Sequence, residues 1–324
     1  MPNSRWSRRG VAGLIAAASL GLSATAFAQG YPNKNITFIV PFAAGGPTDT
    51  IARVVGEHMG RTLGQQIVIE NVAGAGGTTG SERVSKATPD GYVMLLHHQG
   101  ITAAPALYDN LRYDTKGAFE TVGLINRGPM TVVGKKALEH KTAKELFDWM
   151  VANPDKFTMG HAGVGSNSHV CGLLMEKVLG KKFTFVAYRG TGPAMNDLVA
   201  GQIDVMCDQS TNAVPQVMGG TIKGYLVTDT ERIPSIKDVP TASEAGYPDM
   251  TMTLWNAIYA PKGTPKEAID KINSALRVAL KDPAVIEKFA TVGTTVFPEN
   301  QWSTDAHHKL FLEELDRQAA LLKK

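Results

Sequence analysis

The chain has 324 residues, of which 43% are hydrophobic, enough to bury a sizeable core and more naturally as two lobes than as one. Its 33 Lys and Arg residues only slightly outnumber its 30 Asp and Glu residues, for a formal net charge of +3. The lysine pairs are isolated rather than gathered in a stripe, so the composition argues against nucleic acid as a partner.

Residues 1–28 have the three parts of a secretory signal peptide. Arg5, Arg8 and Arg9 form a charged start, an apolar stretch follows, and Ala26–Ala28 match a small-x-small cleavage site. A retained membrane anchor is the alternative, but the apolar stretch is short and rich in Ala and Gly. No later segment reads as a membrane span. We expect cleavage at this site and a mature protein exported to the periplasm.

From residue 36 the chain alternates short apolar runs with amphipathic stretches. The first half predicts strands at 36–40, 66–71 and 92–97 and helices at 48–64 and 78–87. The order returns in the second half, with strands at 156–161, 183–188 and 203–208 and helices at 166–180 and 192–202. Short buried-type strands separated by helices are typical of parallel βαβ units, so the pattern predicts two α/β lobes, each a sheet flanked by helices.

Two extended segments, 123–135 and 252–261, lie between the patterns and are predicted to cross from one lobe to the other. The chain then turns mainly helical, over 265–290 with a break at Pro283 and over 305–324. A ligand cleft between the lobes follows, because ligand pockets favour domain interfaces. We assign residues 29–128 and 254–324 to lobe one and residues 129–253 to lobe two.

The first strand runs into a glycine loop, PFAAGGPTD, just before the helix over 48–64. Gly45 and Gly46 lack a Cβ, so their amides can approach a ligand closely. Thr48 or Asp49 is predicted to cap the helix, whose positive dipole end favours an anion. A loop that simply requires glycine is the alternative. The candidate ligand-binding residues here are Phe42, Ala44, Gly45, Gly46, Thr48 and Asp49.

A second glycine loop, NVAGAGGTTG, resembles a dinucleotide fingerprint without completing it. Thr79 stands where the third glycine of G-x-G-x-x-G belongs, and the chain has no P-loop. We therefore expect no nucleotide and no other cofactor.

A third loop, HAGVGSNSH, leads into the helix over 166–180. Its Ser-Asn-Ser run can cap that helix and offers hydroxyl and amide donors, so helix N-termini would hold a ligand from both lobes. No G-x-S-x-G nucleophile elbow is present. His169 either contacts the ligand or hydrogen-bonds within its own lobe. The candidates are Gly163, Gly165, Ser166, Asn167, Ser168 and His169.

Polar side chains also follow three other strands, at the sheet edge where α/β proteins bind ligands. His97 and His98 are adjacent and point to opposite faces, so one of them and Gln99 should face the cleft. We select His98 and Gln99. Since no third ligand stands at a suitable spacing, we expect no metal. His307 and His308, on the last helix, are expected to be solvated.

Arg189 suits a carboxylate through its bidentate guanidinium, although a surface arginine is an equal alternative. Asp208 and Asn212 follow the strand over 203–208. Asp208 is expected to orient donors rather than to touch an anion, because like charges repel.

The only two cysteines, Cys171 and Cys207, lie on a predicted helix and at the end of a predicted strand. An exported protein can form a disulfide between them, but both can equally be small buried hydrophobic residues. Neither stands at the cleavage site, so the sequence does not indicate lipid attachment.

Taken together, six motifs resemble the Bug family, the periplasmic solute-binding proteins of tripartite tricarboxylate transporters. They are PFAAGGPTD, ENVAGAGGTTG, TPDGYVML, AYRGTGPAMNDLVAGQIDVMCD, DVPTASEAGYPD and WNAIYAPKGTP. The resemblance covers essentially all of the expected mature chain, and within the family it extends in particular to the member that binds terephthalate.

The resemblance implies a type II-like periplasmic binding fold that closes over a carboxylate, with Phe42–Asp49 as one jaw and Gly163–His169 as the other. Tyr188, Arg189 and Asp208 match positions that shape the lobe-two wall. Arg189 and the segment His97–Gln99 depart from the usual residues and add donors, which suggests a second acidic group on the ligand. Phe42 and Trp255 suit an aromatic ring.

The sequence therefore predicts a monomeric receptor, without catalytic residues, that delivers an aromatic dicarboxylate such as terephthalate to transporter membrane subunits. Citrate or another di- or tricarboxylate is the alternative ligand. A ligand-sensing partner of a membrane histidine kinase would use the same fold. A periplasmic hydrolase that uses Ser166 or Ser168 with His169 is the rival without a supporting motif.

Overall fold

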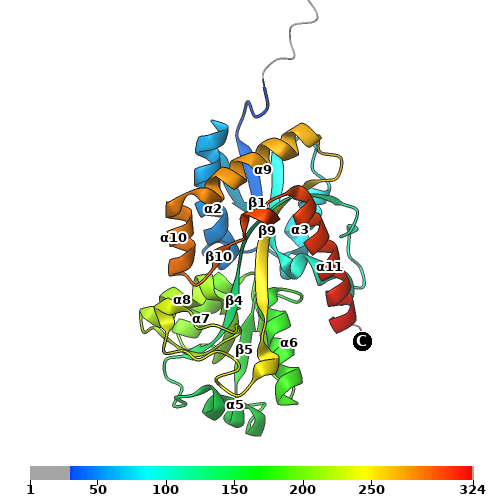
Figure 1. Cartoon of the computed structure of the whole chain (residues 1–324). Helices are drawn as coiled ribbons and strands as arrows, with labels where there is room; N and C mark the ends of the chain where they lie inside the picture. The colour runs from blue at the N-terminus through cyan, green and yellow to red at the C-terminus, as the bar shows by residue number, and fades with distance from the viewer. Residues whose placement is uncertain (1–29, 323–324) are drawn as a thin grey trace, which may run out of the picture.

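The computed structural model describes residues 30–322, which form two α/β lobes joined by long strands (Figure 1). The predicted signal peptide lies outside the described residues. Within residues 30–322, none of the helices has both the length and the apolar character that a membrane crossing requires.

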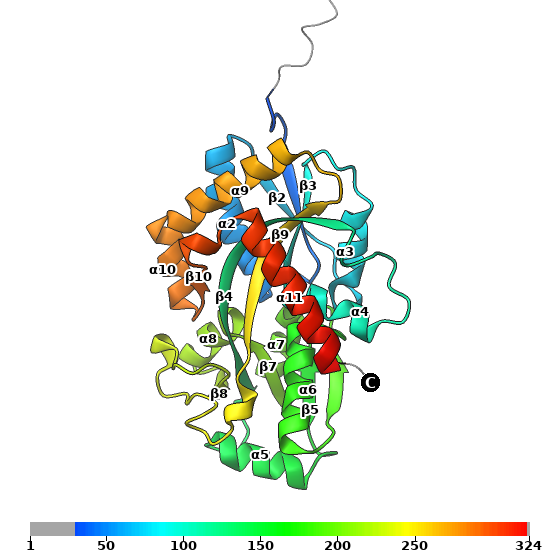
Figure 2. The same cartoon turned by 45° about the vertical axis from the view of Figure 1, so that its right-hand side comes forward.

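Lobe one has a mixed sheet in the order β2-β1-β3-β9-β4, with β10 on the free side of β4. Here β4 spans Phe119–Lys135 and β9 spans Thr253–Pro261. The strands β1, β2 and β3 are parallel, as expected for consecutive βαβ units. Figure 2 shows α11 lying diagonally across this lobe. Apart from β4 and β9, the elements of lobe one are β1 (Ile36–Val40), α2 (Pro47–Leu63), β2 (Ile67–Asn71), η1 (Ala75–Gly77), α3 (Thr78–Ser85), β3 (Val93–His98), η2 (Gln99–Thr102), α4 (Ala104–Leu107), α9 (Lys266–Lys281), α10 (Pro283–Thr291), β10 (Thr295–Val296), η5 (Glu299–Gln301) and α11 (Thr304–Leu322).

Lobe two repeats the plan with the sheet order β6-β5-β7-β4-β8. Its strands β5, β6 and β7 are again parallel. Its elements are α5 (Ala143–Ala152), β5 (Thr158–His161), α6 (Asn167–Leu179), β6 (Thr184–Ala187), α7 (Thr191–Val199), β7 (Val205–Gln209), α8 (Ser210–Met218), β8 (Ile222–Val227), η3 (Pro234–Ile236) and η4 (Pro248–Met250).

Two strands connect the lobes. The strand β4 (Phe119–Lys135) pairs with β9 (Thr253–Pro261) from Phe119 to Pro129, and then with β7 and β8 from Met130 onward. Each lobe has its own buried core, one around Phe38 and the other around Phe147. Separate cores joined by a pair of strands allow the lobes to move as rigid bodies.

Two local predictions were wrong. Helix α2 begins at Pro47 with Gly46 as its N-cap, so neither Thr48 nor Asp49 caps it. The Asp49 carboxylate instead accepts hydrogen bonds from Gly45 N–H and from Arg53. His307 is fully buried rather than solvated, because its ring packs 4.7 Å from that of Tyr259 on β9.

Candidate functional site

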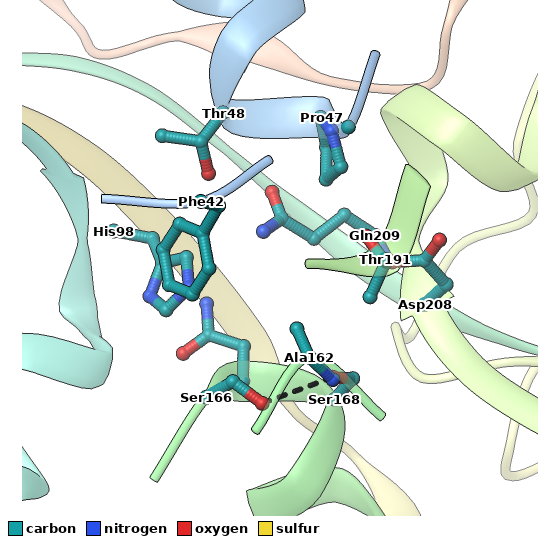
Figure 3. Close-up of a pocket in the computed structure, with 12 residues that line it drawn as sticks. Phe42, Pro47, Thr48, His98, Ala162, Ser166, Ser168, Thr191, Asp208 and Gln209 are labelled. Carbon is teal, nitrogen blue, oxygen red and sulfur yellow. Dashed lines mark hydrogen bonds between the residues drawn. The ribbon is translucent and has the colours of Figure 1, made fainter. Parts of the chain in front are cut away.

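A small cavity lies between the lobes, where four helices begin (Figure 3). Helix α2 comes from lobe one, and α6, α7 and α8 come from lobe two. Each helix N-terminus carries a partial positive charge, so the four together favour an anion. The cavity is lined by Phe42, Gly46, Pro47, Thr48, His98, Ala162, Ser166, Asn167, Ser168, Thr191, Asp208 and Gln209.

The start of α2 lines the cavity with Gly46, Pro47 and Thr48. Its N-cap, Gly46, makes no side-chain cap bond, and Pro47 has no N–H to satisfy. Asp49 points away from the cavity: its carboxylate accepts from Gly45 N–H at 3.0 Å and from Arg53 Nε at 2.9 Å. Burial alone would raise the pKa of Asp49, but these bonds and one from Asn71 lower it. Asp49 therefore fixes the loop from behind.

The start of α6 is held by hydroxyl groups. Ser166, one of the three residues in the predicted capping run, is the N-cap; its Oγ accepts from His169 N–H at 3.3 Å and donates to the carbonyl of Gly163 at 2.6 Å. Ser168 Oγ accepts from Ala162 N–H at 2.9 Å. Asn167 is buried, and its Nδ2 has no partner among the described residues. An amide donor without a partner at a cavity wall is suited to a ligand acceptor.

His169 is engaged inside lobe two. Its Nδ1 accepts from Gly165 N–H at 3.3 Å, and its ring packs 4.7 Å from that of His161. Burial lowers the pKa of His169 to about 4. Since the hydroxyls of Ser166 and Ser168 are also bonded within the loop, the structure shows no nucleophile–base pair here.

The end of β7 brings a buried carboxylate to the cavity. Asp208 is fully buried; its Oδ1 accepts from Gln209 N–H at 2.8 Å and its Oδ2 from Asn212 Nδ2 at 2.5 Å. Burial raises the pKa of Asp208 to about 6. Gln209 extends its amide into the space between the lobes, and its Oε1 is buried without a partner among residues 30–322 (Figure 3).

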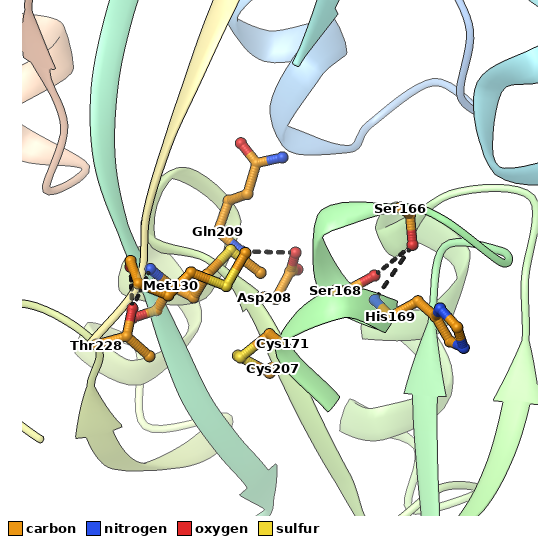
Figure 4. The surroundings of a disulfide bond; sticks show 10 residues. Met130, Ser166, Ser168, His169, Cys171, Cys207, Asp208, Gln209 and Thr228 are labelled. Carbon is orange, nitrogen blue, oxygen red and sulfur yellow. Dashed lines mark hydrogen bonds between the residues drawn. A yellow bond between two sulfur atoms is a disulfide. The ribbon is translucent and has the colours of Figure 1, made fainter. Parts of the chain in front are cut away.

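A disulfide lies directly behind these groups (Figure 4). Cys171 on α6 and Cys207 on β7 form a disulfide, with Cα atoms 6.1 Å apart, so they are not two separate buried thiols. The bond joins the helix that carries Ser168 to the strand that carries Asp208.

The lobe-one wall is aromatic. The rings of Phe42 and His98 stack 4.7 Å apart, and His97 packs edge-on against Phe42 from outside the cavity. His98 Nδ1 accepts from Gly100 N–H at 2.9 Å, which leaves its proton on Nε2. Burial lowers the pKa of His98 to about 3, so the ring is a neutral donor near pH 7.

The lobes are in contact at both rims of the cavity. At one rim Ala43 N–H donates to the carbonyl of Arg189 at 3.0 Å, and at the other Tyr108 OH donates to the carbonyl of Val164 at 2.8 Å. The cavity volume is about 10 Å³, which is room for about one water molecule. The structure therefore shows a closed arrangement, and a larger ligand requires the lobes to separate further.

Eight of the predicted site residues line the cavity, namely Phe42, Gly46, Thr48, His98, Ser166, Asn167, Ser168 and Asp208. Nine others support its loops or lie beside it, namely Ala44, Gly45, Asp49, Gln99, Gly163, Gly165, His169, Arg189 and Asn212. The side chain of Arg189 is exposed, and only its carbonyl takes part in the contact between lobes.

Four lining residues were not individually predicted, namely Pro47, Ala162, Thr191 and Gln209. Gln209 directly follows Asp208 at a strand end, and this position was the available signal for it. No Lys or Arg lines the cavity, and no cluster of three possible metal ligands occurs within the described part of the chain.

The family of this chain is decided by a match to the family model for "Tripartite tricarboxylate transporter family receptor", which covers residues 51–324. The chain belongs to this receptor family. It is therefore a periplasmic-type solute-binding protein and not an enzyme, and the family is the one that its motifs resemble.

Individual relatives agree with this assignment. A protein of Agrobacterium vitis, the "UPF0065 protein in the TAR-I ttuE-ttuC' intergenic region", is 44% identical over 98% of this chain and 92% of its own length. The periplasmic binding protein BugD is 40% identical with a TM-score of 0.87, over 90% of this chain and 97% of its own. MatC from Rhodopseudomonas palustris, solved with bound malate, is 38% identical with a TM-score of 0.87, over 90% of this chain and all of its own (100%).

Proposed function

We propose that this receptor captures a dicarboxylate in the interlobe cavity and delivers it to the membrane subunits of a tripartite tricarboxylate transporter. The observation that carries the proposal is the convergence of four helix N-termini on one cavity. Backbone N–H groups and helix dipoles bind carboxylates without a cationic side chain. The malate bound to MatC, a relative with the same fold, supports this class of ligand.

The proposed mechanism is capture in an open state followed by closure. A ligand that contacts α2 and α6 together makes its full set of bonds only when the lobes close, so it shifts the population toward the closed form. We propose that the receptor does this as a monomer in the periplasm, after removal of residues 1–28.

For the ligand itself, the finer proposal is an aromatic dicarboxylate such as terephthalate. The stacked pair of Phe42 and His98 supports it, since one wall of the cavity is then an aromatic surface that can pack against a ring. The second candidate is a small aliphatic dicarboxylate such as malate. The cavity volume of about 10 Å³ favours it, because a smaller ligand requires less separation of the lobes.

Thermal melting of the mature protein with malate, adipate, citrate and terephthalate tests these proposals. A ligand that binds the native state raises the melting temperature by an amount that grows with its concentration over Kd. Recovery of intact ligand after long incubation is expected of a receptor. Loss of cellular uptake on deletion of the gene separates transport from sensing, since a sensor would leave uptake intact. No shift with any of the four acids would contradict the proposal.

A further inference from the structure

The charges around the cavity do not balance once an anion is bound. A dicarboxylate brings two negative charges into a space that already contains the fully buried carboxyl of Asp208. The only other titratable side chain in the lining is His98, which is neutral. The helix N-termini supply partial positive charge for the ligand, but a further buried negative charge on Asp208 is strongly disfavoured unless another positive charge or a proton offsets it.

Most charged groups on the surrounding elements are already paired with one another, and Lys177 on α6 is exposed and outside the cavity lining. On α2, Asp49 binds Arg53; on α6, Glu176 binds Lys182; and beside β4 and β7, Lys135 binds Asp204. On α7, Asp197 accepts from Tyr188 OH.

The remaining titratable side chains nearby do not supply a positive charge either. His161 on β5 and His169 on α6 each accept a backbone N–H at Nδ1, and burial lowers the pKa of both. Arg127 and Arg189 are exposed, and neither lines the cavity. His97, behind Phe42, is buried, and its pKa is lowered as well. No cation among these groups is free to offset both Asp208 and a ligand.

We propose that the receptor binds its dicarboxylate together with one proton, and that this proton resides on Asp208. The proposal rests on the proposed function. A protonated Asp208 removes one negative charge from the cavity and turns an acceptor into an O–H donor that a ligand carboxylate can accept. The proton comes from solvent, and no covalent bond other than O–H forms.

Closure is what makes the proton uptake possible. In the closed form Asp208 is fully buried, and burial raises its pKa to about 6 even though Asn212 and Gln209 N–H donate to it. A bound anion nearby raises the pKa further. When the lobes separate, water reaches the carboxyl and the pKa returns toward its ordinary value near 4. Asp208 therefore gains a proton as the ligand is enclosed and loses it on release.

The pH dependence of ligand affinity follows from this additional proton. Because the complex holds one proton more than the separated partners, the affinity for a dianion falls as pH rises from about 4, the pKa of the open form, toward the higher pKa of the complex, by up to about tenfold per pH unit. His98 adds no pH dependence between pH 5 and 8, since its pKa is about 3.

Titration calorimetry with malate and with terephthalate tests the proposal. At pH 6, in two buffers of different ionisation enthalpy, we expect a net uptake that approaches one proton per ligand. Asp208→Asn keeps the shape and removes the titration, so it should bind without uptake and with a flat pH profile from 6 to 8. Asp204→Asn is the matched control, immediately before the same strand and outside the cavity, and should retain the uptake.

Several outcomes separate this inference from the receptor proposal. Tight binding of malate with no proton uptake overturns the role of Asp208 and leaves the receptor function intact. Tighter binding of aspartate than of malate, again without proton uptake, also overturns the protonation of Asp208. The ammonium group of the ligand would then be the partner of the Asp208 carboxylate. The wild-type measurement decides these points even if the variant does not fold.

If none of the acids binds, the receptor proposal and this inference fail together, because the proton is taken up only when a ligand is enclosed.

Discussion

The two lobes share one βαβ plan but form their sides of the cavity by different means. Lobe one contributes the uncapped start of α2 and the stacked rings of Phe42 and His98. Lobe two contributes polar side chains, which hydroxyl bonds at Ser166 and Ser168 and the disulfide behind them hold in place.

This difference suggests a division of tasks. The helix N-termini of both lobes suit any carboxylate of suitable size, and the aromatic faces of lobe one add apolar contact area, so these groups supply general affinity. Side-chain amides and a carboxyl discriminate between ligands, because a mismatch leaves a buried polar group without a partner. The lobe-two groups Asn167, Asp208 and Gln209 are therefore the positions where selectivity is expected.

The largest effect should come from preventing the two walls from meeting. A Cβ added at Gly76 in lobe one would overlap the backbone carbonyl oxygen of Val164 in lobe two. Gly76→Ala should therefore disfavour closure and weaken binding of the best ligand more than about 1000-fold, since apparent affinity scales with the closed population. Isothermal titration measures the loss.

Gly64→Ala is the matched control for this variant. Gly64 has φ 66° and Gly76 has φ 63°, so both substitutions cost similar backbone strain, but a Cβ at Gly64 meets nothing within 4 Å. Both variants should lose similar stability, and only Gly76→Ala should lose binding. Equal affinities in the two variants would show that closure at this rim is not needed.

The second prediction concerns the disulfide that only lobe two has. Replacing Cys171 and Cys207 together by alanine removes a cross-link over a sequence separation of 36, which should lower the unfolding free energy by about 2–4 kcal/mol. Urea denaturation monitors the change. Because the bond connects the elements of Ser168 and Asp208, ligand affinity should fall too. An unchanged affinity would mean that the hydroxyl bonds alone position the lobe-two wall.

The lobe-one wall was easier to predict from sequence than the lobe-two wall. Glycines between a strand and a helix are a local signal, and the jaw at Phe42–Asp49 follows from it. The strands and helices that the sequence predicts and the break at Pro283 follow from local periodicity in the same way, whereas α5, α8 and β8 were not predicted. The Ser166 cap was also found, because capping depends on neighbouring residues alone.

What could not be predicted depends on distant packing. Nothing near His307 in the chain indicates that Tyr259 and Trp255 enclose it. The predicted cap of α2 was wrong because the Asp49 carboxylate accepts hydrogen bonds from Arg53 and from Asn71, and Asn71 comes from the strand β2. That Asp208 has no counter-ion can be recognised only when every neighbouring ion pair is known.

The third prediction changes the donor in the lobe-two wall. Asn167 Nδ2 is buried at the cavity without a partner among the described residues, so a ligand carboxylate is its expected acceptor. Asn167→Asp replaces this donor by an anion and should weaken binding by about 1.5–3 kcal/mol. Asn167→Leu removes the amide without adding a charge and should cost less. Competition binding at pH 8 measures both, and an Asp variant that binds as well as the wild type would show that the amide faces elsewhere.

The smallest effect is expected at Arg189, the one basic residue selected from the sequence. A guanidinium bound to the ligand would make Arg189→Ala cost about 1.5–3 kcal/mol of binding free energy. In the structure the side chain is exposed and outside the cavity lining, and the contact with Ala43 N–H uses the backbone carbonyl, which alanine retains. We therefore expect a change below about 0.5 kcal/mol, as for surface positions generally. Calorimetry separates the two values. A large loss would mean that the Arg189 side chain moves into the cleft when ligand is present, and lobe two would then bind its anion through a formal positive charge.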